Sequence, residues 1–165
     1  TDFSQDMGYK KEIYLAVGNY YYRNGNEKKA EEIYKDYMKT GKDLEIGKNL
    51  VNLLVNEKKY TEVIEYLNMM DETNDSLYLK GIAYMGIGEY AKADSFFSSL
   101  NGREGISKEL QEKISYNIIK NNFLWEKYDL VISEGEKYLG STYIYGLDGT
   151  KLLQNRKLCK SQRIF

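Results

Sequence analysis

Residues 12–37, EIYLAVGNYYYRNGNEKKAEEIYKDY, hold six tyrosines and an internal glycine in a pattern that otherwise predicts helix. Within this stretch, Gly18, Tyr21, Ala30 and Tyr34 form the pattern Gly-x2-Tyr-x8-Ala-x3-Tyr. Residues 81–97, GIAYMGIGEYAKADSFF, repeat the pattern with identical spacing and a final phenylalanine. Self-similarity at a fixed spacing is typical of arrays built from one repeated helical unit.

Two weaker copies keep the same spacing. Between the strong copies, the four positions hold Val51, Leu54, Val63 and Leu67. After them, the same positions hold Ile119, Asn122, Val131 and Gly135. The intervals between the first positions are 33, 30 and 38 residues, and the loop NGREGI at 101–106 accounts for the longest one.

Each copy predicts two helices joined by a tight turn, because apolar residues recur every three or four positions on both sides of Gly25 and Gly88. The chain contains no proline, so no residue forces a break inside a helix. The first helices of the pairs are expected at 11–24, 44–57, 74–87 and 107–124. The second helices are expected at 27–40, 59–70, 90–100 and 127–139.

The repeated residues suit close packing of the paired helices. Gly18 and Gly81 each cost about 1 kcal/mol in helix propensity, a loss that is recovered if they let the second helix approach closely. Ala30 and Ala93 are the small residues expected to face them. We therefore interpret the aromatic residues of the pattern, Tyr21, Tyr34, Tyr84 and Phe97, as packing residues.

The pattern resembles the tetratricopeptide repeat (TPR) family, whose two-helix units of about 34 residues carry such glycine, aromatic and alanine positions. The resemblance implies an all-α fold, a right-handed α-solenoid of about four units near 11–43, 44–73, 74–106 and 107–139. Residues 1–139 would form this array. Residues 140–165 form a basic C-terminal segment, either a cap or a tail, in which 140–153 suits a hairpin and 150–163 a helix. The weak fourth copy and the start at Thr1 suggest, as a hypothesis, a piece of a longer protein.

A stacked two-helix array exposes one side of its first helices as a concave surface, where a protein or peptide partner is expected to bind. Asparagine amides on this side offer a donor and an acceptor to a peptide backbone, and tyrosines offer flat apolar contact. The residues expected to bind the partner are Asn19, Tyr22, Lys48, Asn52, Tyr78, Ile82, Met85, Tyr116 and Lys120.

Some TPR proteins bind carboxylates through a clamp of lysines, asparagines and an arginine. Lys48 and Asn52 match the first pair of this clamp and Lys113 matches its second lysine. Leu79 and Asn117, however, stand where an asparagine and the arginine belong. The resemblance therefore does not extend to the clamp. The alternative to partner binding is a structural or assembly module, including a homo-oligomer, with no ligand on the concave face.

Several function classes are disfavoured by composition. The chain has no histidine, the commonest general base and transition-metal ligand, so we expect no enzyme, metal or cofactor. Acidic residues such as Glu31 and Glu32 lie beside lysines and are interpreted as solvated helix surface.

The charge distribution disfavours nucleic acid as a partner. The last 15 residues hold five basic and no acidic residues, which leaves 19 basic and 25 acidic residues before them. An acidic body is poorly suited to phosphate binding. No apolar run approaches the ~18 residues of a membrane span, so we expect a soluble protein, with the compartment, cytoplasmic or periplasmic, left open.

Overall fold

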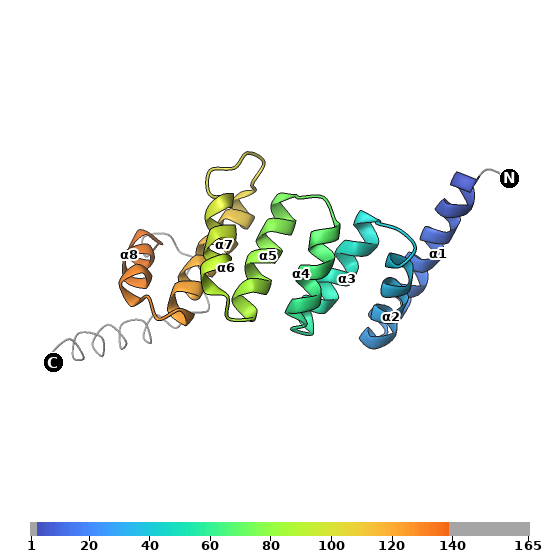
Figure 1. The fold of residues 1–165 in the computed structure, drawn as a ribbon, viewed down its shortest axis with the longest axis horizontal. Helices are drawn as coiled ribbons and strands as arrows, with labels where there is room; N and C mark the ends of the chain where they lie inside the picture. Colours follow the sequence, from blue (N-terminus) through green and yellow to red (C-terminus); the bar gives the residue numbers. More distant parts are fainter. Residues whose placement is uncertain (1–2, 139–165) are drawn as a thin grey trace. The chain divides into compact units, whose positions relative to one another are not determined.

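The computed structural model of the protein describes residues 3–138, with side chains from residue 9 to residue 137. These residues form eight α-helices and no strand (Figure 1). The helices are α1 (Phe3–Arg23), α2 (Glu27–Met38), α3 (Leu44–Asn56), α4 (Tyr60–Met69), α5 (Asn74–Gly86), α6 (Tyr90–Leu100), α7 (Lys108–Leu124) and α8 (Tyr128–Tyr138). The prediction of an all-α fold is confirmed for this part of the chain.

The helix bounds agree with the predicted ranges to within two residues, with one exception. Helix α1 begins at Phe3 instead of residue 11. The repeat pattern does not reach the residues before 11, so it could not predict this extension. The hairpin or helix predicted within 140–163 lies outside the described residues.

The same turn joins the two helices of each pair. It places one residue in the left-handed region, where L side chains are disfavoured: Gly25 (φ +74°), Lys58 (+61°), Gly88 (+82°) and Glu126 (+60°). In each turn, the next residue donates its N–H to the carbonyl five residues earlier, as Asn26 does to Tyr21 at 2.9 Å and Lys59 to Leu54 at 2.9 Å. This is the Schellman ending of a helix, and glycine supplies its left-handed residue in only two of the four turns.

Side chains that accept hydrogen bonds from free N–H groups cap several of the helix starts, although α4 and α6 have no such side-chain cap. Asp43 accepts hydrogen bonds from the N–H groups of Glu45 and Ile46 at 3.0 Å, and thus starts α3. At the start of α5, Thr73 and Ser76 cap each other, since each hydroxyl accepts from the other residue's N–H at 3.1 and 2.8 Å. The chain thus defines helix starts without proline.

Each of the two helical glycines contacts the second helix of its pair, but the nearest side chain is the aromatic residue of the pattern and not the predicted alanine. A Cβ built on Gly18 would lie 2.7 Å from Cζ of Tyr34, and one on Gly81 would lie 2.8 Å from Cδ1 of Phe97. Tyr34 is 2% exposed and Phe97 is 0% exposed. Each glycine therefore leaves room for an aromatic ring of the second helix in its pair.

The chain divides into two compact units, with the boundary between Ser76 and Leu77. In the first unit α1 packs on α2, α2 on α3 and α3 on α4. Its buried side chains include Ile46, Leu50, Leu54 and Val63. This unit carries the first two of the four helix pairs.

The second unit has its own core. Phe97 and Leu100 of α6 cluster with Leu77 and Met85 of α5 and Ile114 of α7. Helix α7 also packs on α8. Each unit therefore holds part of the surface predicted to bind a partner.

Candidate partner-binding surface

Helix α3 has one buried side and one exposed side in the first unit. Ile46, Leu50 and Leu53 are at most 1% exposed. Lys48 and Asn52 are exposed, and their spacing of four residues places them side by side on the helix. Neither side chain has a polar partner among the described residues, so both groups are available to a ligand.

Two further predicted residues, Asn19 and Tyr22, lie near Tyr34 in the first unit. The Tyr34 hydroxyl donates a hydrogen bond to Oδ1 of Asn19 at 2.8 Å. Burial raises the pKa of Tyr34, and the side chain of Asn49 partly opposes this. Tyr22 interacts electrostatically with the same hydroxyl, and its ring is 44% exposed. The Asn19 side-chain oxygen is therefore already hydrogen-bonded within the unit, whereas the Tyr22 side chain is exposed to solvent.

In the second unit, Tyr78 of α5 meets Asn117 of α7. The Nδ2 group of Asn117 donates to the Tyr78 hydroxyl at 2.9 Å and to the Lys113 carbonyl at 2.8 Å. Burial raises the pKa of Tyr78, while Lys113 and the hydrogen bond from Asn117 act in the opposite direction. Because Asn117 is only 5% exposed, this amide serves packing between the two helices.

The remaining predicted residues of the second unit differ in accessibility. Ile82 is partly buried against the core cluster, and Tyr116 and Lys120 are partly buried on α7. Met85 is 7% exposed and belongs to the core cluster itself. Its thioether fills space between helices, so we leave Met85 out of the candidate surface.

The candidate surface therefore has one part in each unit. The first part is Asn19, Tyr22, Lys48 and Asn52, of which Tyr22, Lys48 and Asn52 are exposed. The second part is Tyr78, Ile82, Tyr116 and Lys120, all partly buried. The exposed polar groups are concentrated in the first part, which makes it the better place to seek a ligand.

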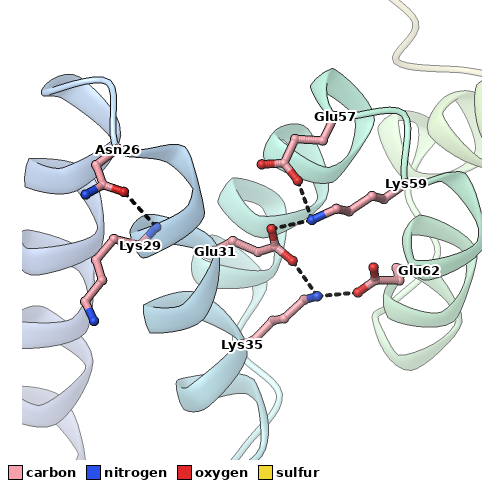
Figure 2. A network of polar contacts seen from close by, with 7 residues as sticks. All are labelled: Asn26, Lys29, Glu31, Lys35, Glu57, Lys59 and Glu62. Atoms are coloured by element: carbon pink, nitrogen blue, oxygen red, sulfur yellow. Dashed lines mark hydrogen bonds and ion pairs between the residues drawn. The ribbon is translucent and has the colours of Figure 1, made fainter.

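The most connected charged groups of the first unit surround Glu31 (Figure 2). Glu31 is 6% exposed, which corrects its interpretation as solvated surface. Its carboxylate pairs with Lys35 at 2.5 Å and with Lys59 at 2.7 Å. Lys35 also pairs with Glu62, and Lys59 with Glu57, so the network ties α2 to the turn after α3 and to α4.

The ion pairs of this network stabilise the packing of the helices. Burial alone would raise the pKa of Glu31, but hydrogen bonds from Lys35 and Lys59 hold it below its ordinary value. The carboxylate therefore stays ionised near neutral pH, with each oxygen bonded to an ammonium group, and is a poor general acid or base. The burial of Glu31 was not predictable from its neighbours, because it is followed by a second glutamate, Glu32, that is exposed.

Comparison with known proteins does not identify a family for this chain. The sequence matches no protein-family model and no curated protein. Among the described residues, no group of three or more aspartate, glutamate or cysteine side chains could hold a metal ion. The helices between residues 3 and 138 include none with the length and apolar character of a membrane span.

Proposed function

We propose that the chain is a non-catalytic protein-interaction module of the TPR type, which binds a peptide or helix of a partner protein on the exposed side of its first helices. The observation that carries the proposal is the contrast within α3. One side of this helix is fully buried, while Lys48 and Asn52 stand exposed on another with no partner in the described residues.

The chemistry of this side suits a peptide. The Asn52 amide can donate to and accept from a peptide backbone, and the Lys48 ammonium can pair with a carboxylate. Tyr22 of α1 adds an exposed ring from the same unit. Tyrosine is one of the residue types that contribute most to binding at protein interfaces.

A selection from a displayed random-peptide library tests the proposal. The enriched peptides are synthesised, and their affinities are measured by fluorescence anisotropy for the wild-type chain and for the double variant Lys48→Ala, Asn52→Ala. We expect at least tenfold weaker binding, because losing a charge-assisted and a neutral hydrogen bond costs about 2 kcal/mol.

The matched control is Lys28→Ala, Asn68→Ala, which removes the same two residue types from exposed positions on α2 and α4. This variant should bind the peptides like the wild type. Equal affinity for all three proteins, or no enriched peptide, would refute a peptide site at Lys48 and Asn52.

A further inference from the structure

Helix α1 carries a stripe of exposed apolar side chains. Tyr9, Ile13, Val17 and Tyr20 are 67%, 61%, 37% and 63% exposed, respectively. Their spacings of four, four and three residues place them along one side of the helix. Gly18, which contacts α2, lies on another side. Single exposed apolar residues are ordinary, but a continuous stripe on one helix indicates a contact surface.

The repeat register shows what covers this side elsewhere in the chain. Shifting Ile13, Val17 and Tyr20 by the 33-residue interval between Gly18 and Val51 leads to Ile46, Leu50 and Leu53 of α3. These three residues are at most 1% exposed. Helix α2, the second helix of the preceding pair, packs on α3. The side that is open on α1 is thus buried on α3.

Helix α7 repeats this observation in the second unit. The positions equivalent to Ile13 and Val17 are Ile114, which is 0% exposed, and Ile118, which packs against the core cluster. That cluster contains Phe97 and Leu100 of α6, again the second helix of the preceding pair. In the second unit, residues of both α5 and α6 pack around Ile114, and in the first unit α2 packs on α3, so helices of the preceding pair cover this register.

The area of the stripe is too small for a stable dimer formed through it alone. The four side chains expose on the order of 400 Å². Two copies meeting through their stripes would bury about 800 Å², below the ~1,200 Å² at which stable interfaces begin. A single helix laid along the stripe would bury a similar area, which suits weak and reversible binding.

We propose that this stripe of α1 is a docking site for one amphipathic α-helix of a partner protein, packed as α2 packs on α3. The chemistry of the partner helix follows from the two internal examples. On α2, Tyr34 lies near Asn49 of α3, and Met38 lies beside Gly47 of α3. On α6, Phe97 and Leu100 cluster with Ile114 of α7. The partner helix should carry an aromatic residue followed three or four positions later by an aliphatic one.

The probe is a peptide with the sequence of residues 26–39, NEKKAEEIYKDYMK, labelled with a dye and stapled as a helix between positions 28 and 32. Both positions are exposed in the chain. A control peptide carries the same staple with Tyr34→Ser and Met38→Ser. Fluorescence anisotropy measures binding to the wild-type chain, to Ile13→Ser, Tyr20→Ser, and to the control variant Met69→Ser, Ile87→Ser. The last pair alters residues that are each 44% exposed on other helices or turns.

We expect saturable binding of the first peptide to the wild type and to the control variant, and at least tenfold weaker binding to Ile13→Ser, Tyr20→Ser. The control peptide should bind at least tenfold more weakly to the wild type. The single variant Tyr9→Ser should weaken binding severalfold. Because Tyr9 is 67% exposed, this variant tests the stripe even if the double variant misfolds.

Equal affinity for the wild type and both α1 variants, or no saturation, would overturn the proposal. A dimer in sedimentation equilibrium that Ile13→Ser, Tyr20→Ser dissociates would also overturn it, because the occupant would then be a second copy. The inference is independent of the proposed function, since Lys48→Ala, Asn52→Ala should leave the binding of the stapled peptide unchanged.

Discussion

At the scale of single residues, contact between a glycine and an aromatic ring sets the distance between paired helices. Gly18 leaves the space that the Tyr34 ring occupies, and Tyr34 in turn donates a hydrogen bond to Asn19. The absence of a side chain at one position thus fixes both the packing of α1 on α2 and the orientation of a polar group. A larger residue at position 18 has to displace the ring.

Gly18→Ala is therefore expected to destabilise the protein by about 1–3 kcal/mol, although alanine favours helix by about 1 kcal/mol over glycine. Urea unfolding followed by circular dichroism measures the change. Gly135→Ala in α8 is the matched control, because a Cβ there meets no described atom within 4 Å. Stabilisation by Gly18→Ala as large as that by Gly135→Ala would contradict the packing role.

Glu31 provides the second prediction at this scale. Because its pKa in the folded chain lies below the ordinary value of 4.5, ionised Glu31 stabilises the fold above that pH, and the contribution is lost as the pH falls through the lowered pKa. Glu31→Gln should thus cost about 1–3 kcal/mol at pH 7 and much less at pH 3.

Urea unfolding at both pH values measures this difference. Glu32→Gln, an exposed neighbour whose Lys29 partner lies at 3.4 Å, should change stability by less than about 0.5 kcal/mol at either pH. A penalty for Glu31→Gln that is the same at pH 3 and pH 7 would show that the charge of the carboxylate is not what stabilises the fold.

The repeat pattern predicted which apolar residues are buried, but it did not predict which polar residues are buried. Ala30 and Ala93 are fully buried, as expected from their small size in the pattern. Burial of Glu31 and Asn117 depends on partners 28 and 39 residues away in sequence, Lys59 and Tyr78. The spacing of nearby residues carries no information about such distant partners, so the burial of Glu31 and Asn117 could not be predicted.

At the scale of elements, the turns between paired helices share one backbone geometry with different residues. Apolar periodicity and the glycines at 25 and 88 predicted two of these turns directly. The repeat intervals then placed the equivalent turns of the other two pairs at positions 58 and 126. Lysine and glutamate at the latter positions adopt a left-handed conformation that glycine adopts without strain. The geometry is thus set by the helix packing, even where the residue disfavours it.

Lys58→Gly and Glu126→Gly should each stabilise the protein by about 1 kcal/mol, because they relieve the left-handed conformation of a side-chain-bearing residue. Thermal unfolding followed by circular dichroism detects the rise in Tm. The reverse substitution, Gly25→Ala, should lower Tm by a similar amount. A fall in Tm for both glycine variants would mean that these turns are not held in the common geometry.

At the scale of the whole molecule, the chain distributes its candidate surface over two compact units. The helices and their pairing were predictable from the sequence, because both are encoded by local spacing. This spacing could not divide the surface residues into accessible and buried ones, because Met85 and Asn117 depend on how α5, α6 and α7 pack together. The proposed ligand site is therefore at Lys48 and Asn52, where exposure and free polar groups coincide.

The most direct test of this claim is an NMR titration of the ¹⁵N-labelled chain with a selected peptide. We predict the largest chemical-shift changes at the backbone amides of Lys48 and Asn52, with further changes at Asn19 and Tyr22. The exposed residues of α4, such as Glu65 and Asn68, should stay unchanged. Shifts confined to α4, or to the apolar stripe of α1, would contradict a partner site on the exposed side of α3.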